Sequence, residues 1–209
     1  MASILLNIAI AIISVLAWVS VVQGHGDDRN LMAHGLRSLK YYTVLSNLFS
    51  GLASALSVAG MLRSPGAPAP WTLVLKLAGA SVVMVTFLTV ILFLGPTMGW
   101  TYMFKAGNFW LHLALPLAAA ADVCLFAPIG DLPFLATLAP VAFTAAYGVF
   151  YLGRIMLHGR ERNGVVYDFY GFLRTGEDKA AAVVVVVMLT GTWLIAVALW
   201  FISRLIGLA

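Results

Sequence analysis

A threonine and a histidine stand at matching positions near the ends of two long apolar segments. Thr43 follows Lys40 by three residues at the start of one segment, and His112 lies about four residues into another. At a rise of about 1.5 Å per residue, both lie within roughly 6 Å of one membrane surface if their segments enter from the same side. An imidazole beside a hydroxyl can act as a general base while the oxygen attacks an ester carbonyl. The pair therefore points to ester hydrolysis, provided that the two segments are neighbours.

Three further polar side chains accompany this pair. Ser46 and Asn47 come three and four residues after Thr43, on the same helical face, and Asn108 precedes His112 by one turn. Each could steady a developing oxyanion or orient the imidazole. The structural alternative stays open, because Ser and Thr in membrane helices often bond to their own helix, and Asn and His often join helices.

A second polar pair lies toward the opposite membrane surface. Lys76 is about one turn into its segment from that side, and Asp122 is near the far end of the segment that holds His112. Matching depths predict a buried structural ion pair, because an unpaired carboxylate there would be costly. A proton or ion relay is the alternative. No titratable residue lies between Asp122 and His112, about 15 Å apart along one helix, to support a relay.

The remaining metal-ligand types do not form a recognisable site. His25, His34 and His158 lie near loops, so no second intramembrane His supports a zinc site or bis-imidazole haem. The single cysteine, Cys124, excludes an intrachain disulfide and a cysteine-rich cluster. We therefore expect neither a metal nor a cofactor.

These residues are set in a chain whose composition is that of a membrane protein. Of its 209 residues 62% are hydrophobic and 10% charged, with a mean hydropathy of +0.99. Long apolar runs predict six transmembrane helices, with the β-branched run Val183–Val187 helical because no partner strands could close a barrel. The prediction is an all-α polytopic bundle, a single domain over residues 1–209, with spans at about 3–23, 40–62, 71–95, 108–127, 133–153 and 180–203.

Lysine and arginine are distributed unequally between the two sides of such a bundle. Nine of the twelve fall in the loops after the first, third and fifth spans: Arg29, Arg37, Lys40, Lys105, Arg154, Arg160, Arg162, Arg174 and Lys179. The positive-inside rule places these loops in the cytoplasm and both termini outside. The net charge of +4 is explained in this way, so nucleic acid is not an expected partner.

The loop from Arg154 to Lys179 is the longest of these connections. It combines four aromatic side chains, Tyr167, Phe169, Tyr170 and Phe172, with the basic side chains Arg160, Arg162 and Arg174. Interfacial aromatics and snorkelling arginines explain this composition without further function. The alternative is a lid over Thr43 and His112 that excludes water from a lipid carbonyl.

Two motifs resemble a known family. The segments Leu39-Lys40-Tyr41-Tyr42-Thr43-Val44-Leu45-Ser46-Asn47-Leu48 and Phe109-Trp110-Leu111-His112, the second followed by Pro116 and Ala121-Asp122-Val123, are similar to motifs of the androgen-induced and androgen-dependent TFPI-regulating protein family. The resemblance implies a distant homologue of six-span hydrolases that cleave fatty acid esters of hydroxy fatty acids. It also implies that Thr43 is the nucleophile and His112 its partner.

Three functions therefore remain open from the sequence. The first is an intramembrane Thr/His-dependent hydrolase of lipid esters, with a membrane lipid as substrate and partner. The second is a small transporter or channel lined by Lys76, Asp122 and His112. The third is a lipid-binding protein without catalysis, in which the polar residues join helices. A homo-oligomer is compatible with each.

Overall fold

The structure confirms the all-α, six-span architecture. It is a computed structural model that describes residues 1–23, 35–64, 68–159, 161–162, 165–168, 170 and 178–207. Within these ranges six helices are long and apolar enough to cross a membrane: Ala2–Val22, Tyr42–Arg63, Pro70–Thr97, Gly107–Leu125, Phe134–His158 and Val183–Gly207. These properties are those of an integral multi-pass membrane protein.

Several spans are built from more than one helical element. The elements with α-helical geometry are α1 (Ala2–Val22), α2 (Tyr42–Arg63), α3 (Pro70–Thr89), α4 (Gly95–Met98), α5 (Trp100–Met103), α6 (Gly107–Phe109), α7 (Leu115–Leu125), α8 (Ala139–His158) and α9 (Asp178–Gly207). Two π-helical segments, η2 (Val90–Leu94) and η3 (Trp110–Ala114), lie within the third and fourth spans. Short 3₁₀ turns are η1 (Gly35–Lys40), η4 (Ile129–Asp131) and η5 (Phe134–Leu138).

The predicted boundaries of the spans agree with the structure to within a few residues. The second span begins at Tyr42 because the preceding residues form the turn η1. The fifth continues to His158 and the sixth to Gly207, beyond the predicted ends at about 153 and 203. Arg154, His158 and Arg204 lie in these extensions. Residues with basic side chains can form part of these helix ends, because their charged groups reach the membrane surface.

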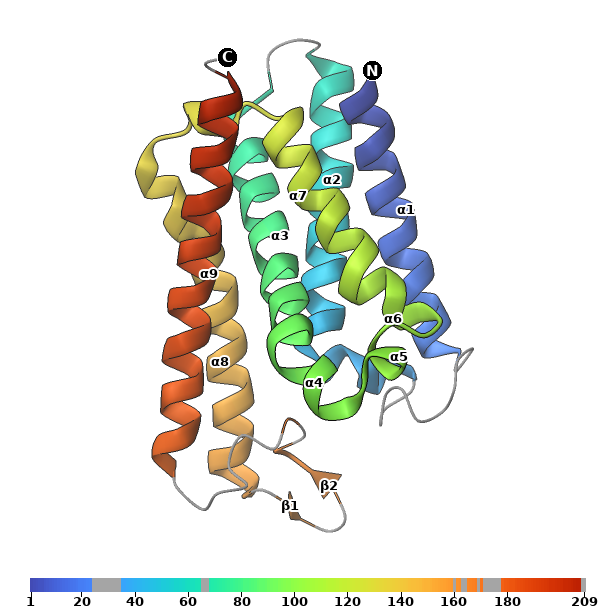
Figure 1. Ribbon diagram of the computed structural model, residues 1–209, viewed down its shortest axis with the longest axis vertical. Helices are drawn as coiled ribbons and strands as arrows, with labels where there is room; N and C mark the ends of the chain where they lie inside the picture. The colour runs from blue at the N-terminus through green and yellow to red at the C-terminus, as the bar shows by residue number, and fades with distance from the viewer. Residues whose placement is uncertain are drawn as a thin grey trace.

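The helix α3 occupies the centre of the bundle. It packs against α2 and α7 on one side and against α8 and α9 on the other, and α1 packs against α2 and α7. Figure 1 shows this arrangement, with both termini at the same end of the bundle. The main apolar core lies where these helices meet and includes Ile10, Leu77, Val83, Leu111 and Val123.

Small residues allow α1, α2 and α3 to approach closely. A Cβ at Gly51 would lie 1.9 Å from Ser14 Oγ, and a Cβ at Gly79 would lie 3.0 Å from the Cα of Ser50. Such close packing is common between membrane helices, where dispersion contacts replace the hydrophobic effect. It fixes the position of α2, which carries Thr43.

The long loop after α8 is described only in part. Glu161–Arg162 (β1) and Val165–Val166 (β2) form a short antiparallel pair, and Tyr167, Asp168 and Tyr170 are also placed. Arg160, Phe169, Phe172 and Arg174 fall outside the described residues, as do Arg29, His25 and His34. The predicted lid therefore stays a prediction.

Candidate functional site

His112 lies in a π-helical segment that a proline explains. In η3 the N–H of Leu115 bonds to the carbonyl of Trp110, five residues back instead of four. The next carbonyl in that pattern, Leu111 O, faces position 116, where Pro116 has no N–H to donate. The Leu111 carbonyl thus needs a donor from outside its own helix, because a buried unpaired carbonyl is costly.

Asn47 supplies that donor. Its side-chain Nδ2 lies 3.1 Å from Leu111 O and 2.7 Å from Thr43 O, so both N–H groups are used. One amide nitrogen therefore holds together the backbones of Thr43 and of the residue before His112. The second and fourth spans are therefore neighbours at this depth, which was the condition for Thr43 and His112 to approach one another. The Asn47 Oδ1 atom is buried and has no hydrogen-bond partner within the described chain.

The hydrogen bond of His112 defines its tautomer. His112 Nδ1 lies 2.9 Å from the carbonyl oxygen of Met103, which can only accept, so Nδ1 carries the hydrogen. The lone pair of the neutral ring is then on Nε2. The side chain is 8% exposed, between α1, α2 and α3. This tautomer leaves Nε2 as the atom that could accept a proton.

The Thr43 side chain is half-buried and uncommitted. Within the described chain its hydroxyl forms no hydrogen bond, so it is held neither by its own helix nor by His112. Thr43 and His112 thus reach the same end of the bundle without direct contact of their polar atoms.

Ser46 and Asn108, the other two candidates, differ in whether they have a hydrogen-bond donor that is not already used. Ser46 Oγ lies 3.1 Å from Thr43 O and 3.2 Å from Thr86 Oγ1, so it joins α2 to α3. Asn108 is buried, and its Nδ2 donates to Tyr102 O at 3.4 Å. A second N–H remains on that nitrogen. Asn108 is therefore the candidate with a donor available for a ligand.

The start of α2 is held by Tyr170, whose role at this position was not predicted from the sequence. Tyr170 accepts a hydrogen bond of 2.9 Å from the N–H of Tyr42, and its ring packs edge-on against Tyr41. The first N–H groups of a helix lack partners within it, so Tyr170 acts as a cap next to Thr43. The signal was the cluster of aromatic residues in the loop, but an interfacial position explained it equally well.

Several ionisable groups at this end have shifted pKa values. Burial raises the pKa of both Tyr41 and Tyr170 to about 12. Burial, with the charges of Arg154 and Arg37, lowers the pKa of Lys40. Tyr147, which donates a hydrogen bond of 2.7 Å to the Lys40 carbonyl, holds this turn against α8. The tyrosines therefore stay protonated at neutral pH.

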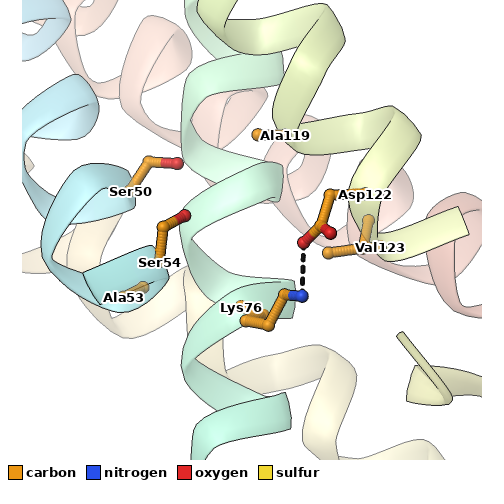
Figure 2. A pocket seen from close by; sticks show the side chains of 7 residues that line it. All are labelled: Ser50, Ala53, Ser54, Lys76, Ala119, Asp122 and Val123. Carbon is orange, nitrogen blue, oxygen red and sulfur yellow. Dashed lines mark ion pairs between the residues drawn. The ribbon is translucent and has the colours of Figure 1, made fainter. Parts of the chain in front are cut away.

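The second polar centre lies toward the end of the bundle that holds both termini. Lys76 Nζ and Asp122 Oδ2 form an ion pair between α3 and α7 (Figure 2). Asn7 Nδ2 and Ser3 Oγ donate to the other carboxylate oxygen at 2.9 and 3.1 Å. The sequence analysis did not identify Ser3 or Asn7 as partners. Their spacing of four residues on one face of α1 was the available signal.

Comparison of the chain with known protein families, with curated proteins and with solved structures finds no match. The resemblance of two motifs to the hydrolase family therefore stays a prediction.

Proposed function

We propose that this protein is an intramembrane hydrolase of lipid esters, in which Thr43 is the nucleophile and His112 the general base. The substrates would be fatty acid esters of hydroxy fatty acids or similar lipid esters. The observation that supports this most directly is the Asn47 side chain. Because Asn47 Nδ2 bonds to both Thr43 O and Leu111 O, the candidate nucleophile and base are held at one depth of the bundle.

The reaction would proceed in two steps. His112 Nε2 accepts the proton of the Thr43 hydroxyl as Thr43 Oγ1 forms a bond to the ester carbonyl carbon. The tetrahedral intermediate collapses, the bond to the leaving alkoxide breaks, and His112 returns the proton to that oxygen. A water molecule then attacks the acyl-threonine with His112 again as the base. The bond between the acyl carbon and Thr43 Oγ1 breaks, and His112 returns the proton to Thr43 Oγ1. The products are an alcohol, here the hydroxy fatty acid, and a free carboxylic acid.

Oxyanion stabilisation would fall to Asn108 before Asn47. Both N–H groups of Asn47 already donate to carbonyl oxygens, whereas Asn108 retains one on the same segment as His112. In a site of low polarity a single well-placed donor contributes about 2.7–4 kcal/mol to transition-state stabilisation. Ser46 would then act through Thr86, by fixing the first turns of α2.

The charge distribution gives this site an orientation. The start of α2 and the start of the fourth span lie at the end of the bundle opposite both termini (Figure 1), and the loops that the sequence assigns to that side contain nine Lys and Arg residues. We infer that this side is cytoplasmic and that the termini face outward. The ester bond would then enter from the cytoplasmic leaflet.

The test is ester hydrolysis by purified protein in detergent. Wild type, Thr43→Ala and His112→Ala are incubated with a branched fatty acid ester of a hydroxy fatty acid, and the released fatty acid is measured. Thr101→Ala is the matched control, because Thr101 is exposed at the same end of the bundle. The proposal expects release by wild type and the control, with a loss of roughly 100-fold to 10,000-fold in His112→Ala.

Three outcomes would contradict the proposal. Folded wild type that releases no fatty acid from a series of lipid esters is not this hydrolase. Release that survives Thr43→Ala in full would remove Thr43 as the nucleophile. Flux of a solute into liposomes that is unaffected by Thr43→Ala would favour the transporter instead.

A further inference from the structure

A small polar cavity lies beside the Lys76–Asp122 ion pair. Ser50 and Ser54 of α2, Lys76 of α3 and Asp122 of α7 contribute its polar lining, and Ala53 and Ala119 part of its apolar lining (Figure 2). The cavity has room for about one water molecule. The hydrogen bonds of each polar residue in this lining show which donors and acceptors remain without a partner.

Asp122 does not need a further partner. Its carboxylate accepts from Lys76 on one oxygen and from Asn7 and Ser3 on the other. Three donors from two further helices satisfy a group that is 1% exposed. The carboxylate therefore leaves no strong demand for another donor in the cavity.

Lys76 is different, because an ammonium group has three N–H donors. One is directed to Asp122, and within the described chain no protein atom accepts the other two. The residue is 5% exposed, so bulk water does not replace those partners. Donors of a buried ammonium without acceptors carry a large desolvation cost.

The hydroxyls of Ser50 and Ser54 also have no hydrogen-bond partner within the described chain. Other buried hydroxyls here bond to their own helix, as Ser81 Oγ does to Leu77 O at 2.7 Å. Ser50 and Ser54, each 5% exposed, form no hydrogen bond within the described chain. Their oxygens point from α2 toward α3 (Figure 2). Two donors on Lys76 and two hydroxyls thus remain around one small space.

We propose that this cavity binds one water molecule that joins Lys76 Nζ to the hydroxyls of Ser50 and Ser54. Water can accept from the ammonium group and donate to the serine oxygens, which gives it the two to four partners that a buried water needs. An anion is disfavoured because Asp122 already neutralises Lys76 and lines the same cavity. The water hydrates an ion pair whose two side chains are almost fully buried. This site is independent of ester hydrolysis.

Two substitutions at one position separate a hydrated cavity from an empty one. Ser54→Ala removes the hydroxyl and leaves room for the water, whereas Ser54→Val also fills the space. If the cavity is hydrated, valine displaces the water and leaves Lys76 without an acceptor, so the thermal midpoint falls roughly 3–8 °C below that of Ser54→Ala. If the cavity is empty, valine fills a void, and its midpoint equals or exceeds that of the alanine variant. That result overturns the proposal.

A second background distinguishes lost hydration from a steric clash. In Lys76→Met with Asp122→Asn no ammonium group needs the water, so Ser54→Val should no longer fall below Ser54→Ala. A penalty that persists there in full is steric and contradicts the proposal.

Direct observation of the wild type completes the test. A structure at a resolution that shows ordered water should contain one density peak within hydrogen-bond distance of Lys76 Nζ and the two hydroxyls. An empty cavity would overturn the proposal. So would a thermal midpoint that depends on chloride when gluconate replaces it at constant ionic strength, because an anion would then occupy the site.

Discussion

Asn47 Nδ2 donates a hydrogen bond of 3.1 Å to the carbonyl oxygen of Leu111. Pro116 occupies the position in the same helix that would otherwise bond to this oxygen, and it has no N–H to donate. A proline in one helix is thus compensated by an amide in another. This relationship explains why a polar side chain with 1% exposure is retained at position 47. It also makes the stability effects of the two residues depend on one another.

Asn47→Ala should therefore lower stability in a way that depends on Pro116. The single variant leaves Leu111 O and Thr43 O without the amide donor, and we expect a loss of about 1–3 kcal/mol in the free energy of unfolding. Pro116→Ala restores an N–H at position 116, so the double variant should lose less than Asn47→Ala alone. Thermal or denaturant unfolding in detergent measures both. Additive losses would show that Pro116 does not create the demand for Asn47.

The Lys76–Asp122 pair should show a strong dependence between its two members. Lys76→Met leaves a buried carboxylate and Asp122→Leu leaves a buried ammonium, and each should cost about 3–5 kcal/mol. The double variant removes both charges, so it should be clearly more stable than either single variant. Unfolding midpoints of the four proteins form a double-mutant cycle. A loss in the double variant equal to the sum of the two single losses would indicate that the charges do not interact.

Two glycines should respond to alanine in opposite directions. A Cβ at Gly130 would lie 2.5 Å from the Cα of Arg204, a backbone atom that cannot move aside, so Gly130→Ala should destabilise by about 1–3 kcal/mol. A Cβ at Gly153 in α8 meets nothing within 4 Å. Gly153→Ala should be neutral or stabilise by up to about 1 kcal/mol through helix propensity. A tolerated Gly130→Ala would contradict the close contact between η4 and α9.

Stability should decline at alkaline pH because of tyrosines near Thr43. Tyr41 and Tyr170 have a pKa of about 12 in the folded protein, against about 10 when unfolded. Between these values the unfolded chain loses protons that the folded protein keeps, so the free energy of unfolding falls as pH rises from about 10 to about 12. Tyr170→Phe should make this decline shallower. The check is the thermal midpoint of both proteins across that range.

The lowered pKa of Lys40 acts in the opposite direction and provides a control. Its positive charge is disfavoured in the folded state, so deprotonation at alkaline pH relieves a cost. This effect is complete by about pH 10.4, the pKa of an unfolded lysine, so Lys40→Met should remove a rise in stability below that pH and leave most of the decline above it unchanged. An unchanged pH dependence of Lys40→Met below about 10.4 and of Tyr170→Phe above it would mean that neither group is linked to folding.

The spans could be predicted from the sequence because a membrane imposes a length on every apolar helix. The β-branched run Val183–Val187 lies within α9, as the absence of partner strands required. Lys76 and Asp122 could be paired because depth along a helix follows from residue number. Residues whose role depends on the packing of a third element were missed: Ser3 and Asn7 at the carboxylate, and Tyr170 at the start of α2.

The candidate site was predictable in its location and not in its hydrogen bonds. Matching depth placed Thr43 and His112 at one end of the bundle. Sequence spacing could not reveal that both N–H groups of Asn47 donate to backbone carbonyls. The Leu111 carbonyl needs this donor because of the π-helical turn before Pro116. Asn108 is therefore a better candidate for the oxyanion donor than Asn47.

The wider turn at η3 behaves as a one-residue insertion in an otherwise regular helix. Each residue turns an α-helix by about 100°, so removal of one residue, such as Ala114, would restore regular geometry and rotate everything before it by that amount. Asn108 and His112 would then face a different side of the bundle, while Asp122 would keep its own. The insertion therefore sets the angular register between the two polar centres on one membrane span.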